Sequence, residues 1–150
     1  MTPAELPPAP SVAGTSLAGA APYVITAEEN RTLCASLGSV AAADGTAHPI
    51  YFFIATQVGM GRSVAGLCAL CDFDVEEGPM IASSTVTFNR TLMTGQPYWV
   101  TGEIKSLVRK RSRSLGVMDV LEYALRLSLP DGGMVLETVN VWVLPRRSLA

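Results

Sequence analysis

The stretch Pro49–Leu70 has the sequence PIYFFIATQVGMGRSVAGLCAL. Arg62 is its only charged residue, so a helix here is apolar on nearly every face and has to be buried. Pro49 suits the first position of such a helix, because the N–H groups of a first turn have no partner within the helix. Gly59 and Gly61 weaken a helix by up to about 1 kcal/mol each, but small residues also allow close contact with a sheet. We predict one buried helix over this stretch.

The chain after Asp72 has the period of β-strands. The segment Met80–Leu92 is rich in β-branched residues, and successive side chains alternate between two faces. Turn sequences separate it from three further predicted strands, at residues 98–108, 117–129 and 134–144. A buried helix followed by an antiparallel sheet has few stable packings, because the sheet must cover the helix. We therefore predict an α+β domain in which a curved antiparallel sheet wraps the central helix.

The composition is that of one globular domain. The chain has 150 residues, of which 49% are hydrophobic and 16% charged. A domain of this length buries roughly 68–70% of its unfolded surface, so its core needs no disulfide or metal. The formal net charge of −2 gives no long-range field that would attract a polyanion. These figures exclude a wholly disordered chain and argue against a nucleic-acid partner.

The first 22 residues differ from the rest. They contain five prolines, no lysine or arginine, and no long apolar run, which fits neither a signal peptide nor a membrane span. We predict a flexible or extended arm over residues 1–22, a single domain over residues 23–147, no membrane partner and a cytoplasmic location. Directly after the arm, Thr26 and Glu29 form a capping box that starts a helix, and Gly38 is placed to end it.

The three cysteines do not form a disulfide or metal pattern. Cys68 and Cys71 are the only close pair, and zinc would need further ligands in a chain with one histidine. We interpret both as small apolar residues inside a helix, with a redox pair as the alternative reading. No metal or redox cofactor follows from the residues.

One segment carries a family resemblance. Val86–Gln96, VTFNRTLMTGQ, is similar to the strand-and-turn signature of the MaoC-like dehydratases and (R)-specific enoyl-thioester hydratases, which have the hot dog fold. Thr91 stands where that family usually has a proline, and Gln96 where it usually has an acid. Three later segments follow in the family's order: Tyr98–Ile104, Lys110–Arg113 and Leu129–Gly133. The resemblance covers roughly residues 22–146 and implies a curved sheet wrapped around a central helix.

The resemblance also implies a catalytic pair. Family hydratases carry Asp-x-Asn-Pro-x-His before the central helix, whereas this chain has Asp44-Gly-Thr-Ala-His48, one residue shorter and without Asn-Pro. By this match His48 is the base, which suits its ordinary pKa of about 6.5, and Asp44 is its helper. A backbone N–H at the start of the helix would stabilise the charge on the thioester oxygen. The alternatives are a helix-capping or loop histidine and an ordinary Asp-Gly turn.

Further polar residues are candidates for binding. We predict substrate contacts for Tyr51 and Arg62, because an arginine on a buried helix needs a carboxylate, a carbonyl or a ligand. The predicted bend between two strands carries four basic residues: Arg109, Lys110, Arg111 and Arg113. These four side chains could contact the phosphates of coenzyme A or the acidic surface of an acyl carrier protein. Alternatively, they form a solvated hairpin end whose charges block edge-to-edge pairing.

The function expected from the resemblance is a MaoC-like dehydratase or hydratase. Its substrate would be a 3-hydroxyacyl or enoyl thioester of coenzyme A or a carrier protein, with no other cofactor. Members of the family usually cover exposed sheet edges by forming a dimer, so the resemblance implies a homodimer or a hot dog heterodimer. Two alternatives stay open. One is a hot dog thioesterase in which Asp44 or Asp72 activates water; the other, which the missing Asn-Pro favours, is a non-catalytic acyl-binding subunit.

Overall fold

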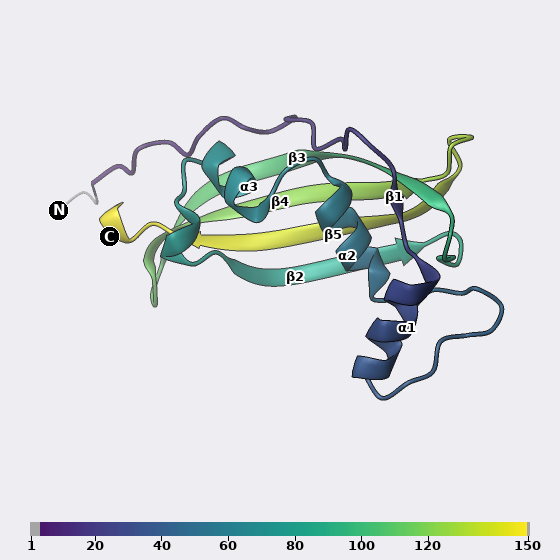
Figure 1. Ribbon diagram of the computed structural model, residues 1–150. Helices are drawn as coiled ribbons and strands as arrows, with labels where there is room; N and C mark the ends of the chain where they lie inside the picture. Colours follow the sequence, from purple (N-terminus) through teal and green to yellow (C-terminus); the bar gives the residue numbers. More distant parts are fainter. Residues whose placement is uncertain (1–3, 150) are drawn as a thin grey trace.

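A computed structural model describes residues 4–149 (Figure 1). Five antiparallel strands form one sheet in the order β1-β3-β4-β5-β2. The strands are β1 (Tyr23–Val24), β2 (Met80–Phe88), β3 (Pro97–Ser112), β4 (Gly116–Ser128) and β5 (Met134–Pro145). The helices are α1 (Ala27–Ser36), α2 (Tyr51–Gly59) and α3 (Val64–Leu70), with short 3-10 turns at Val75–Glu77 and Arg147–Leu149. The predicted α+β class and the antiparallel sheet are confirmed.

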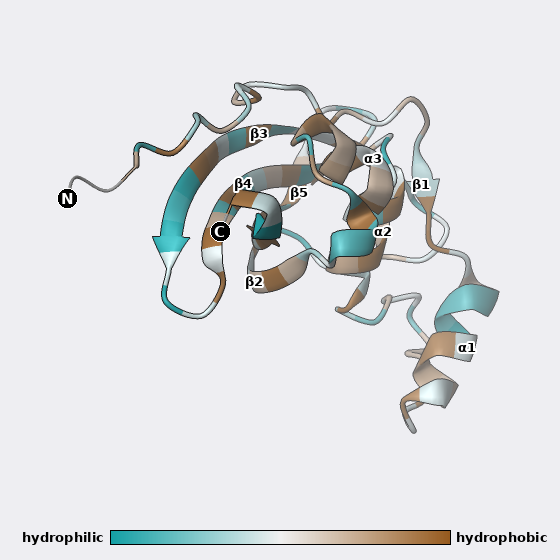
Figure 2. Ribbon diagram, turned by 90° about the vertical axis from the view of Figure 1, so that its left-hand side faces the viewer, coloured by the Kyte–Doolittle hydropathy of each residue, from teal (hydrophilic) through white to brown (hydrophobic). Residues whose placement is uncertain are grey.

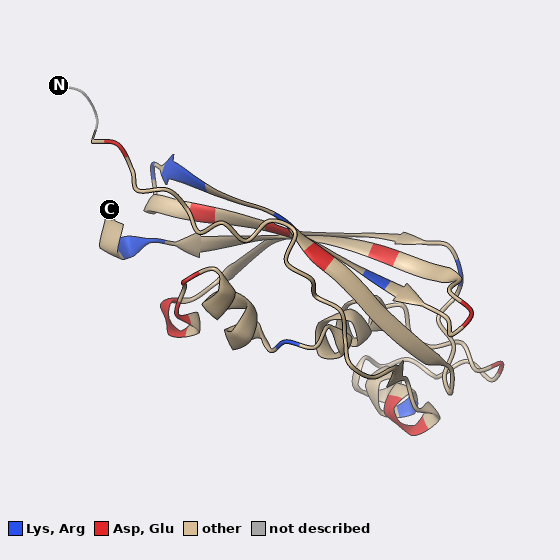
Figure 3. Ribbon diagram, turned by 90° about the horizontal axis from the view of Figure 1, so that it is seen from above, with Lys and Arg blue, Asp and Glu red and all other residues tan. Residues whose placement is uncertain are grey.

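The sheet is curved, and the helices lie on one of its faces (Figures 1, 2 and 3). On β4, Leu121, Tyr123 and Leu125 are fully buried and share this face, since alternate residues of a strand point the same way. Helix α2 packs over β3, β4 and β5. The edge strand β2 is covered least by α2, and nearly all of its residues are exposed.

Glycine allows α2 to lie close to the sheet. A Cβ atom on Gly59 would be 2.5 Å from the side chain of Val100 on β3, and one on Gly19 would be 1.9 Å from the carbonyl oxygen of Gly59. A larger residue at Gly19 would have to move the backbone, and one at Gly59 would have to displace the Val100 side chain. The expectation that the small residues of this helix allow close contact with a sheet is confirmed at Gly59.

The prediction of one continuous helix over Pro49–Leu70 was wrong. Helices α2 and α3 are separate and bent by 62°. Gly61 between them has φ 75°, a left-handed conformation that ends a helix, and Ser63 then caps α3 by accepting from the N–H of Gly66. The stretch is also not buried on every face, because Val58 is 66% exposed and Val64 is 42% exposed.

The N-terminal segment does not extend away from the domain as a flexible arm. The backbone N–H groups of Gly14, Leu17 and Gly19 donate to carbonyl groups of β3, and Leu17 is buried. The segment therefore runs along β3 and covers part of that edge of the sheet. The sequence pattern concealed this because prolines are tolerated at an edge wherever no N–H is needed. Residues 1–3, also part of the predicted arm, lie outside the described residues.

A buried ion cluster ties together the end of the sheet near the β3–β4 hairpin. Asp119 is 0% exposed, and its two oxygens accept from Arg109 Nε and Arg146 Nε, each at 2.8 Å. Arg146 also donates to the carbonyl groups of Cys71 and Asp72 and lies over the ring of Phe73. One carboxylate thus joins β3, β4, the C-terminal end of β5 and the chain that follows α3.

We expect Asp119→Ala to lower the free energy of unfolding by about 3–5 kcal/mol, because two arginines would lose their buried counter-charge. Urea unfolding followed by circular dichroism measures this change. A loss below about 1 kcal/mol would show that the cluster does not hold this end of the sheet.

A second ion network lies on the opposite face of the sheet. Arg126 donates to both oxygens of Glu103 and to Glu137, and Lys105 lies 2.8 Å from Glu103. Hydrogen bonds from Arg126 and then Lys105 lower the pKa of Glu103 to about 2. These side chains are partly exposed, so the network contributes less to stability than the buried cluster.

The stabilisation by Glu103 has a defined pH range. Its pKa is depressed in the folded chain, so the contribution is complete above the unfolded value of about 4.3 and is lost as pH falls through about 2. We expect Glu103→Gln to cost up to about 1 kcal/mol at pH 7 and almost nothing near pH 2. Urea unfolding at several pH values tests this, with Glu122→Gln as the control, because Glu122 has no ion pair within residues 4–149. A cost that is independent of pH would contradict it.

Candidate functional site

The structure brings the two motif segments of the sequence together at the start of α2. Thr46 pairs with Met93, and the N–H of Ala47 donates to the carbonyl of Leu92 at 2.8 Å. The N–H of Thr94 donates to the carbonyl of Gly45, also at 2.8 Å. The stretch that contains Asp44 and His48 therefore lies alongside the end of the signature segment.

Helix α1 fixes the position of His48. The predicted capping box is present, because Thr26 accepts from the N–H of Glu29 and Glu29 reaches back to Thr26. Further along α1, Asn30 is buried, and its side-chain oxygen accepts from the N–H of His48 at 2.9 Å. The histidine backbone is thus held from a helix 18 residues earlier in the chain.

The His48 ring is engaged with the start of α2. Its Nδ1 accepts from the N–H of Ile50 at 3.1 Å, so in the neutral ring the proton is on Nε2. A histidine protonated on Nε2 donates there and is not a base at that atom. The histidine acts in part as a cap for the helix, which is the alternative left open by the sequence.

The backbone amides at the start of α2 are also engaged. The N–H groups of Tyr51, Phe52 and Phe53 donate to the carbonyl groups three residues earlier, at 3.0–3.1 Å. With the Ile50 N–H on the His48 ring, each amide from residue 50 to residue 53 has a partner. The expected oxyanion donor is therefore not free at these positions.

Asp44 lies in an exposed turn. Its Oδ1 accepts from the N–H of Thr46 at 2.9 Å, and this backbone hydrogen bond lowers the pKa of its carboxyl below the ordinary value. Within residues 4–149, Asp44 makes no hydrogen bond or ion pair with His48. The two proposed catalytic residues are near one another in sequence but do not form a hydrogen-bonded pair.

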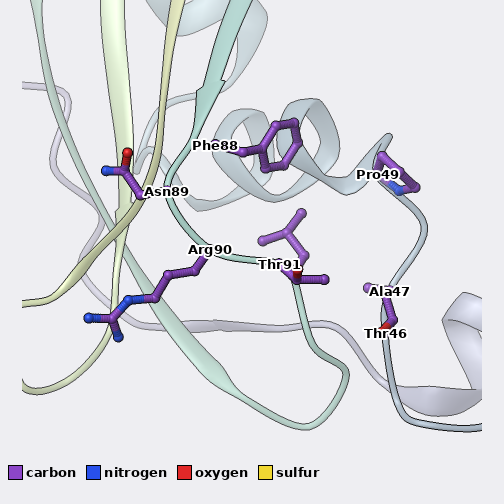
Figure 4. A pocket seen from close by; sticks show the side chains of 8 residues that line it. Thr46, Ala47, Pro49, Phe88, Asn89, Arg90 and Thr91 are labelled. Carbon is purple, nitrogen blue, oxygen red and sulfur yellow. The ribbon is translucent and has the colours of Figure 1, made fainter.

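A hollow of about 350 Å³ lies where the two motif segments meet. Its lining residues are Thr46, Ala47, Pro49, Phe88, Asn89, Arg90, Thr91 and Leu92. Figure 4 shows Phe88 extending toward Pro49, whereas Asn89 and Arg90 extend away to the other side of the strand. The Phe88 ring also meets Phe52 of α2 edge to face, at 6.2 Å between centroids. Neither Asp44 nor His48 lines this hollow.

The two other candidate residues of this region lie away from the hollow. Tyr51 is 1% exposed and faces α1, where burial raises the pKa of its hydroxyl. Arg62 is exposed in the break between α2 and α3, so it needs no buried partner. The expectation that Arg62 lies on a buried helix failed because Gly61 ends α2 before it.

The basic run is divided between two environments. Arg109 pairs with buried Asp119 and donates to the carbonyl groups of Pro7 and Pro8, and Arg111 donates to that of Ala4. All four basic residues of the run lie in β3 or in the β3–β4 hairpin, at the opposite end of the sheet from Phe88. Lys110, Arg111 and Arg113 are exposed, and contact with a phosphate or an acidic carrier protein stays a prediction for the whole run.

The cysteines are buried and reduced. Cys34, Cys68 and Cys71 have free thiols, and burial raises the pKa of Cys71 to about 11. A thiol with a raised pKa is a poor nucleophile at neutral pH. Among residues 4–149 no cluster of His, Cys, Asp and Glu side chains could hold a metal ion. In the same range, no single helix is long and apolar enough to cross a bilayer, although α2 and α3 pass that test as a bent pair.

Comparison with known proteins identifies the fold. No protein-family model matches the chain, and a search of curated proteins gives no match. The structure is similar to a chain of the HadBC (3R-hydroxyacyl-ACP dehydratase) complex from Mycobacterium tuberculosis, with 16% identity, a TM-score of 0.66, and coverage of 89% of this chain and 97% of that one. The chain has the hot dog fold.

Two further hot dog structures are comparably similar. The ChsH1-ChsH2 complex from Mycobacterium tuberculosis has 17% identity and a TM-score of 0.64, covering 87% of this chain and 82% of that chain. A MaoC-like dehydratase from Rhodospirillum rubrum has 13% identity and a TM-score of 0.62, covering 91% and 94%. The resemblance to the MaoC-like dehydratases seen in the sequence is thus confirmed at the level of the fold.

The sequence reasoning missed a group of polar residues on the inner face of this hot dog sheet. Thr138, Asn140 and Trp142 alternate along β5 and are all buried. The sequence did contain a signal for these residues. Thr138 and Asn140 are polar, and they stand at inward positions of a predicted strand, where apolar residues are usual. Gln57 on α2 gives no such signal, because it is a single polar residue in a helix that is apolar on nearly every face.

The state of the His48 ring is directly measurable. We expect ¹⁵N chemical shifts at neutral pH to place the proton of the neutral ring on Nε2, because Nδ1 accepts from the Ile50 N–H. The chain has a single histidine, so the signals need no further assignment. A proton on Nδ1 would contradict the hydrogen bond to α2.

Proposed function

We propose that this chain binds an acyl thioester as one half of a hot dog dehydratase assembly, in which the partner subunit supplies the catalytic base. The observation that carries the proposal is the hydrogen bond from the Ile50 N–H to His48 Nδ1. This hydrogen bond engages the histidine ring with the start of α2. Asp44 accepts from the Thr46 N–H and not from the histidine. The absence of the Asn-Pro of the hydratase motif supports the same proposal.

The exposed edge of the sheet supports a partner subunit. Strand β2 has the sequence MIASSTVTF, without a charged residue, and among residues 4–149 no strand pairs with its outer edge. Natural proteins usually protect such an edge with charge, proline or another chain. The HadBC and ChsH1-ChsH2 structures are themselves complexes. We propose a second hot dog subunit, identical or different, along β2.

The apolar surface between α2 and β2 supports binding of an acyl chain. Ile81 and Phe88, near the two ends of β2, are 58% and 42% exposed. Phe53 and Val64 line a second hollow, of about 260 Å³, beside Ile81. Removing an alkyl chain from water gains about 0.8 kcal/mol for each buried methylene group. We propose that the acyl chain lies along this side of α2.

Assays of the purified chain with crotonyl-CoA and (R)-3-hydroxybutyryl-CoA test the proposal. We expect binding without interconversion, and His48→Ala should retain that binding while losing at most about 1 kcal/mol of stability, because one exposed hydrogen bond is removed. Calorimetry and the absorbance of the enoyl thioester give the two readouts. Addition of a catalytic hot dog partner should restore interconversion.

Two results would overturn the proposal. If the chain alone interconverts the thioesters and His48→Ala lowers the rate by 100-fold or more, His48 is a catalytic base, since a general base contributes roughly 10²–10⁴-fold. If free coenzyme A is released instead, the chain is a thioesterase. The control Asn89→Ala, at the rim of the first hollow but pointing away from it, should change neither binding nor rate.

A further inference from the structure

The outer face of the sheet, which points away from the helices, carries a row of apolar side chains (Figure 3). Residues paired in register across the four long strands form this apolar row, and from β2 to β3 they are Met80, Val143, Val120 and Val108. Met80 and Val108 are 42% and 45% exposed, and the two valines between them are partly exposed. An antiparallel sheet with one solvated face normally presents polar side chains on that face. The apolar row departs from this pattern.

The apolar surface extends beyond the row. Met118 on β4 and Val139 and Val141 on β5 point to the same face, because alternate residues of a strand do so. No helix within residues 4–149 covers them (Figures 2 and 3). Four strands of 9 to 16 residues, spaced about 4.8 Å apart, present roughly 750 Å², close to the ~800 Å² that each partner buries in a standard interface. The outer face is therefore large enough for a stable interface.

Two residues of opposite charge stand on the two sides of the apolar row. Lys110 of β3 lies on the hairpin side of the row, and Glu122 of β4 lies on the other side. Neither residue makes an ion pair within residues 4–149. Glu122 is paired in register with Val141, so its carboxylate stands beside an apolar surface. A carboxylate in that position needs a cation when another chain covers the face.

The placement of these two charges is self-complementary. A two-fold axis that runs along the apolar row exchanges its two sides, so the Lys110 side of one copy lies over the Glu122 side of the other. The same ion pair then forms twice, as a two-fold interface requires. Facing sheets pack about 10 Å apart, a distance that a lysine and a glutamate extending toward each other can span. An unrelated partner gives no reason for this reciprocal spacing.

We propose that the outer face binds a second copy of this chain, with the apolar rows of the two copies in contact and Lys110 of each copy paired with Glu122 of the other. The outer face is opposite the face that holds α2 and the proposed acyl chain. This interface is therefore distinct from the subunit proposed along β2, and it does not depend on the proposed function. Burial of the apolar row supplies the affinity, and the ion pairs fix the orientation of the two copies.

Sedimentation equilibrium of the purified chain tests this interface. We expect self-association, and Val120→Glu should raise the dissociation constant at least tenfold, because it places like charges at the centre of the contact. Thr101→Glu adds the same charge to the same face, beyond the apolar surface, and should leave the constant unchanged. The far-ultraviolet circular dichroism of both variants should match that of the parent chain.

An exchange of the two charges gives a test that a folding defect cannot imitate. Lys110→Glu alone and Glu122→Lys alone should each weaken self-association about tenfold, because each leaves like charges facing across the interface. The chain that carries both changes should associate within about threefold of the parent chain, because the ion pair is restored with its partners reversed.

A chain that remains monomeric overturns the inference, and so does a doubly changed chain that associates no better than either single variant. Self-association that Val120→Glu leaves unchanged also overturns it, because the contact then lies elsewhere, such as along β2. The proposed function stands in all three cases, because it is tested separately with thioesters.

Discussion

The structure depends on the close contact between α2 and the concave face of the sheet. Gly59 makes this contact possible, since a Cβ atom there would collide with Val100. The contact sets both the depth of the helix and its lateral position over β3, β4 and β5. Because one short helix covers only part of the inner face, most residues of β2 are left exposed. The position of α2 therefore determines both how the sheet is covered and which apolar surface beside β2 stays open for the proposed acyl chain.

The amides at the start of α2 are engaged within the chain itself. His48 and the carbonyl groups that follow it accept the amides of the first turn, so the helix begins without free donors. The segment before α2 is held against the signature segment by the hydrogen bond from the Ala47 N–H to the Leu92 carbonyl. A rigid entrance beside an apolar surface is suited to binding, and chemistry would then come from a second subunit.

Much of the fold could be predicted from local patterns. The capping box at Thr26, the alternation along the strands and the turns between them are signals that act over a few residues. The break at Gly61 was missed because a left-handed glycine and a tolerated helical glycine look alike in sequence. The course of residues 4–22 along β3 and the use of the His48 ring by Ile50 depend on where other parts of the chain lie. Asn140 and Trp142 needed the register of β5 to be recognised as neighbours of Gln57.

The central claim is that an acyl chain lies between α2 and β2, beside Trp142. The chain has two tryptophans, and they lie on opposite faces of the sheet, Trp142 3% exposed and Trp99 38% exposed. The most direct test is the indole ¹H–¹⁵N spectrum during titration with octanoyl-CoA, with each signal assigned from its Trp→Phe variant. We expect the Trp142 signal to shift and to saturate as ligand is added, while the Trp99 signal stays in place. A Trp142 signal that does not move when the thioester is bound, or movement of Trp99 alone, would contradict it.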